Sequence, residues 1–131
     1  MPKSPTADEL ASVGLFVSLA PSDREEVASM MEVQMVDEGD FVVEKGDLSY
    51  KLLVILDGRA QVENDASPIA TLGPGDYFGE TGIVRAAYRN AAVRALTPLR
   101  LGVLVGWEVK DLMHRFPGVK ASIDATVANR S

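Results

Sequence analysis

The chain of 131 residues contains no cysteine and a single histidine, His114. The absence of thiols excludes disulfides, cysteine nucleophiles, thiolate-bound zinc and iron–sulfur clusters. One imidazole is too few for most histidine-based metal sites. Basic residues are also scarce, because 13 Lys and Arg stand against 19 Asp and Glu and give a formal net charge of −6. We therefore expect neither a metal cofactor nor nucleic-acid binding by this chain alone.

Long apolar runs and targeting signals are missing as well. The longest aliphatic run, Leu52–Leu56, is far shorter than the roughly 20 apolar residues that a transmembrane helix needs. Residues 1–6 include prolines and no apolar stretch, so they do not resemble a secretory signal. Apolar residues nonetheless make up 47% of the chain, which is a globular composition. We expect a cytoplasmic protein without membrane contact, with one domain over residues 1–131.

Two helices are predicted near the N-terminus, within about residues 6–32. Thr6–Glu9 and Ser22–Glu25 each have the form of a capping box, in which Ser or Thr is followed three residues later by Glu. Met30, Met31 and Met35 are interpreted as core residues, since the methionine side chain adapts to irregular apolar space.

The middle of the chain, about residues 33–105, has the pattern of a β protein. Roughly six to eight short apolar runs alternate with turn signals at about ten-residue spacing. Asp57-Gly58 is the strongest hairpin signal, and Thr97-Pro98 is predicted to join a last hairpin. The predicted fold class is therefore mainly β with flanking helices (α+β), an antiparallel β-roll or jelly-roll barrel.

Two more helices are predicted over about residues 107–130. The sequence Phe116-Pro117-Gly118 ends the first of them and provides a hinge, because proline cannot continue the helical hydrogen bonds. The last helix has a small apolar face formed by Val119, Ile123 and Val127, so weak docking is expected. Trp107 is expected to pack where the roll meets these helices.

The segment from Gly79 to Val93 interrupts the strand pattern and is rich in glycine and alanine. Between Thr81 and Trp107 the chain has no acidic residue and several arginines, namely Arg85, Arg89, Arg94 and Arg100. A cationic segment in an acidic chain suggests an anionic ligand, although Arg85, Arg94 and Arg100 are interpreted as solvated charges.

The same segment has the residues for a phosphate and a sugar. A helical turn that starts near Gly82 would direct free N–H groups at a phosphate, and Arg89 would add a two-pronged ionic contact. Glu80 would be repelled by an anion unless it accepted a hydrogen bond from a neutral sugar hydroxyl. Phosphate and ribose together indicate a nucleotide.

These residues resemble a known motif. Phe78 to Val84, followed by Arg89 to Val93, resembles the phosphate-binding cassette of cyclic nucleotide-binding domains, a family that includes the catabolite activator protein, protein kinase A regulatory subunits and cyclic nucleotide-gated channels. The cassette of that family contains a short helix. Two positions depart from its pattern, because Thr81 replaces an aliphatic residue and Tyr88 stands where many members have proline.

The resemblance implies roles for individual residues. Glu80 would accept from the ribose 2′-hydroxyl, Arg89 would bind the cyclic phosphate, and Gly82 would donate a backbone N–H to it. Asn90 lies where family members often contact phosphate or base. The complete candidate site consists of Gly79, Glu80, Thr81, Gly82, Arg89, Asn90 and Ala91.

The implied function is that of a non-enzymatic sensor. It would bind a 3′,5′-cyclic purine nucleotide, with cyclic AMP favoured over cyclic GMP, and signal by movement of the C-terminal helices. Those helices could also bind a protein partner or a second copy. Two alternatives stay open: a ligand-free relative that acts as a protein-interaction domain, and a cupin-type enzyme. The second is disfavoured because cupin chemistry needs several histidines on one metal.

Overall fold

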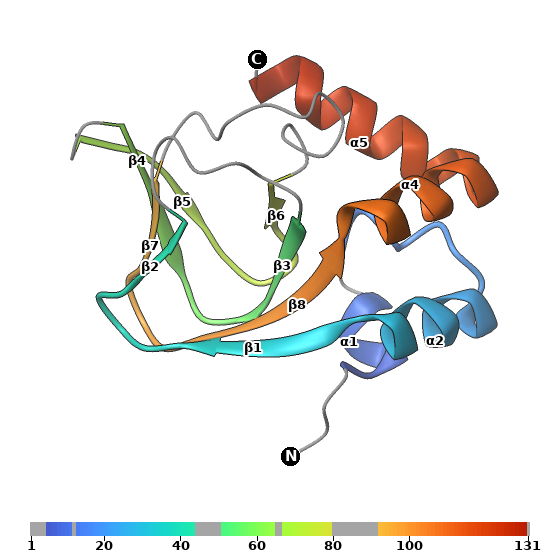
Figure 1. The fold of residues 1–131 in the computed structure, drawn as a ribbon, viewed down its shortest axis with the longest axis horizontal. Coiled ribbons are helices and arrows are strands. Elements are labelled where there is room, and N and C mark those ends of the chain that lie inside the picture. The colour runs from blue at the N-terminus through green and yellow to red at the C-terminus, as the bar shows by residue number, and fades with distance from the viewer. Residues whose placement is uncertain (1–4, 12, 44–50, 65–66, 80–91, 131) are drawn as a thin grey trace.

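The computed structural model describes residues 5–11, 13–43, 51–64, 67–79 and 92–130, with helices gathered at one end of a β-roll (Figure 1). The elements are α1 (Ala7–Ala11), α2 (Pro21–Met30), β1 (Glu32–Val36), β2 (Phe41–Val43), β3 (Lys51–Asp57), β4 (Ala60–Asn64), β5 (Ser67–Leu72), β6 (Tyr77–Phe78), β7 (Ala92–Ala95), β8 (Leu99–Val105), α4 (Gly106–Arg115) and α5 (Pro117–Arg130). This arrangement confirms the predicted fold class.

The strands form two four-stranded sheets. The first sheet has the order β1-β8-β3-β6, and the second has the order β2-β7-β4-β5. All pairings are antiparallel. Within the described residues no strand of one sheet pairs with a strand of the other, so the structure confirms the double-sheet roll and shows no closed barrel there.

The chain changes sheet at every connection between consecutive strands except the one from β4 to β5. The two predicted hairpins at Asp57-Gly58 and Thr97-Pro98 are therefore wrong, since each of these turns joins strands of different sheets. The turns contact each other at one corner, where Arg59 N donates to Thr97 Oγ1 at 2.9 Å. A turn motif specifies a local reversal of the backbone and leaves open which sheet the next strand joins.

The first sheet has an apolar core on each side. In β3, Leu52 and Val54 pack under the helices, whereas Leu53 and Ile55 pack between the two sheets. None of the four is more than 3% exposed. A strand covered on both faces needs apolar residues at every position, which explains the continuous run in this part of the sequence.

The N-terminal helices confirm one predicted cap and correct the other. At α1, Glu9 N donates to Thr6 Oγ1 at 3.2 Å and Thr6 N donates to Glu9 Oε1 at 3.0 Å, as in a capping box. At α2, no side chain caps the helix, and the N-cap is Ala20. Proline is preorganised for the first helical position, so Pro21 begins the helix and Ser22 lies inside it.

Two of the predicted core residues lie at the surface. Met31 is only 1% exposed, as predicted, but Met35 is 58% exposed and Trp107 is 71% exposed. Met35 belongs to β1, an edge strand of the first sheet. Trp107 lies in the first turn of α4, whose buried side is formed by Val109 and Leu112. The predictions for Met35 and Trp107 are wrong because residue type alone does not indicate which face of a strand or helix is covered by other elements.

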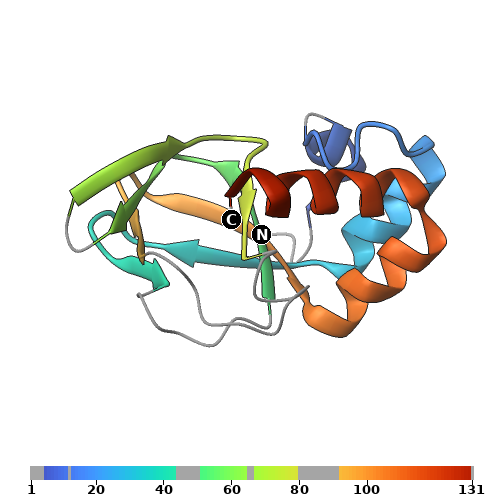
Figure 2. The same cartoon turned by 90° about the horizontal axis from the view of Figure 1, so that it is seen from above.

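The C-terminal helices break where predicted, with α4 ending at Arg115 and α5 beginning at Pro117. Arg115 forms ion pairs with Glu26 of α2 and with Asp111. The pKa of Arg115 is raised mainly by the hydrogen bond that its guanidinium donates to the Glu26 carboxylate. Figure 2 shows α5 running from the helical end back over the roll. Two residues of its apolar face are buried, since Val119 is 1% exposed and Ile123 is 0% exposed.

Candidate functional site

The candidate segment joins β6 of the first sheet to β7 of the second. Of the predicted contact residues, the structure describes Gly79. The remaining ones, together with the predicted short helix, lie outside the described residues: Glu80, Thr81, Gly82, Arg89, Asn90 and Ala91. The structure thus defines the two flanks of the segment.

The first flank, β6, is held firmly against β3. Tyr77 pairs with Val54 and Phe78 pairs with Leu53. One residue earlier, the carbonyl of Asp76 accepts from Ile55 N at 2.9 Å. The two side chains of β6 point to opposite cores, Phe78 between the sheets and Tyr77 under the helices. The strand therefore contacts both cores immediately before the candidate segment begins.

Gly79 follows β6 with a φ of +93°. This left-handed backbone conformation is readily adopted by glycine and rarely by residues with a Cβ atom. The first residue of the candidate site is therefore a position where the backbone itself requires glycine.

The second flank, β7, lies inside the second sheet between β2 and β4. Val93 and Ala95 point into the core between the sheets. On the opposite face, Arg94 Nη2 donates to Glu63 Oε2 at 2.6 Å. Gln61 Nε2 donates to the same oxygen at 2.5 Å. The Glu63 side chain is only 5% exposed, so its charge is compensated by two donors in a largely dry environment.

The arginines counted together in the sequence have separate partners in the fold. Arg94 pairs with Glu63, and Arg100 pairs with Glu9 of α1. The interpretation as a solvated charge is wrong for Arg100, whose side chain is 18% exposed, whereas the Arg94 side chain is 41% exposed and in contact with solvent as well as with Glu63. Arg85 lies outside the described residues.

A contact that the sequence did not predict links the first flank to α5. The hydroxyl of Tyr77 lies 2.5 Å from Thr126 Oγ1 and 3.2 Å from the carbonyl oxygen of Ser122. Tyr77 and Thr126 are 49 positions apart in the chain, so no local pattern could have indicated the pair. The C-terminal helix is therefore bound directly to the strand that precedes the candidate segment.

Two further searches concern the described part of the chain. It contains no group of three or more His, Asp or Glu side chains placed to hold a metal ion. None of its helices combines the length and the apolar character required to cross a bilayer.

Comparison with known proteins agrees with the fold. A solved structure titled "cAMP bound PfPKA-R (141-441)" superimposes with a TM-score of 0.87 at 24% identity, covering 94% of this chain and 43% of that chain. A cAMP-dependent protein kinase regulatory subunit of Schizosaccharomyces pombe is 30% identical, with 93% of this chain and 32% of the relative covered. A cyclic nucleotide-gated potassium channel of Rhizobium etli is 27% identical, with 92% and 34% covered. The chain thus spans about a third of the length of these two curated relatives.

The family model described as "Cyclic nucleotide-binding domain" matches residues 33–116, which extend from β1 through α4. The match includes both sheets and the segment between β6 and β7. The chain therefore belongs to the cyclic nucleotide-binding domain family, a family of regulatory domains.

Proposed function

We propose that the chain binds a 3′,5′-cyclic purine nucleotide at the segment between β6 and β7, without chemical turnover. The observation that carries the proposal is the position of Gly79, which ends β6 with a positive φ directly before Glu80. Arg89 follows Glu80 at the spacing of the family cassette. Family membership supports a nucleotide rather than another anion.

The proposal assigns roles to the candidate site residues within this segment. Glu80 accepts from the ribose 2′-hydroxyl, and Arg89 makes a charge-assisted contact with the cyclic phosphate. Gly82 donates its backbone N–H to the phosphate. Thr81, Asn90 and Ala91 complete the contact surface, with Asn90 near phosphate or base.

Cyclic AMP is the proposed ligand in preference to cyclic GMP. The support comes from the names of similar proteins, since the solved structure is titled as cAMP-bound and the Schizosaccharomyces pombe relative is named as cAMP-dependent.

The two curated relatives named above have different outputs, since one is a kinase regulatory subunit and the other is a channel. We propose that α4 and α5 transmit nucleotide binding to the output that is attached, through a protein partner or a second copy.

Titration calorimetry with both nucleotides tests this function. We expect micromolar affinity, about −8 kcal/mol, for the preferred nucleotide and no conversion of it on prolonged incubation. Arg89→Ala is expected to weaken binding by roughly 2–5 kcal/mol, because it removes the charged partner of a desolvated phosphate. Arg85→Ala is the matched control, for which a loss under about 1 kcal/mol is expected.

Other results would contradict the proposal. Equal losses in the two arginine variants would show that the cassette assignment is wrong. Absence of binding heat and of thermal stabilisation with millimolar cyclic AMP and cyclic GMP would favour the ligand-free interaction domain.

A further inference from the structure

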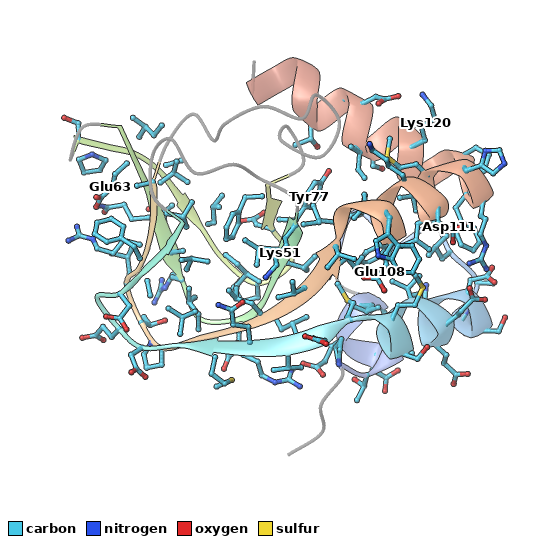
Figure 3. The ribbon with its side chains drawn as sticks, in the orientation of Figure 1. Lys51, Glu63, Tyr77, Glu108, Asp111 and Lys120 are labelled. Carbon is cyan, nitrogen blue, oxygen red and sulfur yellow. The ribbon has the colours of Figure 1, made fainter. Side chains whose placement is uncertain are left out.

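The contact between β6 and α5 is a small hydrogen-bond network of three oxygen atoms. The Tyr77 hydroxyl lies 2.5 Å from Thr126 Oγ1. Thr126 Oγ1 donates to the Ser122 carbonyl at 2.9 Å, and the Tyr77 hydroxyl lies 3.2 Å from that carbonyl. We call this network the Tyr77–Thr126 clasp. Figure 3 labels Tyr77 on the side of β6 that faces α5.

The available protons determine which atom donates and which accepts in each hydrogen bond of the clasp. Each hydroxyl has one proton, and the carbonyl can only accept. A phenol is a stronger donor than an aliphatic alcohol, so Tyr77 donates to Thr126, which in turn donates to Ser122. Hydrogen bonds in such a chain polarise and strengthen one another. The phenol of the roll is thereby connected to the backbone of α5.

The clasp is partly buried, at the margin of an apolar core. Tyr77 is 9% exposed, and the α5 residues Val119 and Ile123 are fully buried beside it in the same apolar core. Hydrogen bonds in such surroundings are costly to leave unmade, because the remaining partner keeps its desolvated polar group. The clasp is therefore formed when α5 is docked and is lost when α5 leaves.

The other end of the clasp is the backbone of β6. Tyr77 is held by pairing with Val54, and Gly79 with its positive φ follows two residues later. A displacement of the Tyr77 ring therefore acts on the backbone that sets the direction of the chain at the first residue of the candidate site.

We infer that Tyr77 is a positioning residue for the nucleotide site: through the Tyr77–Thr126 clasp, docking of α5 and the strand geometry at Gly79 favour each other. This inference rests on the proposed function. Coupling between two binding events is reciprocal, so the factor by which a docked α5 strengthens nucleotide binding equals the factor by which nucleotide strengthens docking.

Three single variants of the full chain test the inference. Tyr77→Phe and Thr126→Val each remove one hydroxyl of the clasp with little change in shape. Ser122→Ala is the matched control, because it removes a hydroxyl from the same helix but leaves the carbonyl acceptor in place. The affinity for cyclic AMP is measured by calorimetry, and amide exchange of α5 is measured with and without cyclic AMP.

We expect Tyr77→Phe and Thr126→Val each to weaken cyclic AMP binding by about 5-fold or more, the lower end of typical couplings. Exchange in α5 should become faster, and the protection of α5 by cyclic AMP should decrease. The double variant should bind no more weakly than either single variant, because one unit is lost only once. Ser122→Ala should behave like the parent chain.

Each contrary result has a distinct meaning. Faster α5 exchange with unchanged affinity would make the clasp a merely structural contact and overturn the inference. Fully additive losses, or unchanged exchange in Tyr77→Phe, would overturn it as well. A parent chain that binds neither nucleotide would instead overturn the proposed function.

Discussion

The two sheets of the roll are similar in size but differ in how they are covered. The first sheet is packed on both faces, as the alternation of β3 between two cores shows. Among the described residues, the second sheet has an apolar core on one face, and its other face carries the ion pair of Glu63 and Arg94 with the exposed side chains of Phe41 and Ile69. In the described part of the chain, the strands that share an apolar core with the helices belong to the first sheet.

The largest difference between the sheets should appear on truncation of a buried side chain. Leu104 of β8 is 0% exposed and packs under the helices, so Leu104→Ala should cost about 2–5 kcal/mol of unfolding free energy. Ile69 of β5 is 60% exposed, and Ile69→Ala should cost less than about 0.5 kcal/mol. Urea unfolding monitored by circular dichroism measures both. Similar losses would show that the outer face of the second sheet is covered after all.

The corner where the chain passes from one sheet to the other should be nearly as sensitive. A Cβ at Gly58 would lie 2.3 Å from the Pro98 carbonyl oxygen, in addition to the strain of a φ of +94°. Gly58→Ala should therefore cost about 2–4 kcal/mol, from strain and overpacking together. Gly39→Ala is the control, because φ is +89° there but nothing lies within 4 Å. Gly39→Ala should cost about 1–2 kcal/mol of unfolding free energy in the same assay. Equal losses in the two variants would show that the close contact with the Pro98 carbonyl oxygen contributes nothing to the cost at Gly58.

The ion pair on the outer face of the second sheet should have an intermediate effect. Arg94→Ala leaves the buried Glu63 carboxylate with Gln61 as a partner, and the expected cost is about 1–3 kcal/mol, reduced by the partial exposure of Arg94. In a Glu63→Gln background the same substitution should cost less, because no charge is left behind. A double-mutant cycle by urea unfolding measures this coupling. The Arg94 guanidinium also lies over the Phe41 ring, 6.0 Å from its centre, and an unchanged cost would mean that Arg94 acts through this contact.

The smallest predicted effect concerns the helices that cover the first sheet. Thr6→Ala removes a cap of α1 and should cost about 1 kcal/mol. Ser22→Ala lies inside α2 and should change stability by less than about 0.5 kcal/mol. Thermal unfolding compares the pair. A larger loss for Ser22 would restore the capping box that the sequence predicts there.

The sequence predicted the elements better than their partners. Apolar runs, the cap at Thr6 and the break at Pro117 are local features, and the structure confirms them. Sheet membership is set by strands far apart in the chain, which is why Asp57-Gly58 was misassigned as a hairpin. The exposure of Trp107 likewise depends on what covers the first turn of α4, and residue type does not encode this.

The candidate site, apart from Gly79, lies outside the described residues and stays a prediction. The motif around Glu80 and Arg89 is contiguous enough to resemble a family cassette, and the structure adds the backbone requirement at Gly79. The clasp between Tyr77 and Thr126 could not be predicted, because it depends on how α5 docks against β6.

The strand order of the first sheet has a consequence for synthesis on the ribosome. β8 lies between β1 and β3, so the last of the described strands in chain order occupies a central position in that sheet. Until Leu99–Val105 leaves the exit tunnel, β1 has no neighbour and the apolar edge of β3 stays open. Pairings between such distant segments slow folding and leave strand edges exposed meanwhile. The nascent chain therefore completes its roll only after nearly the whole domain has emerged, and chaperones that bind open strand edges can act on it throughout that time.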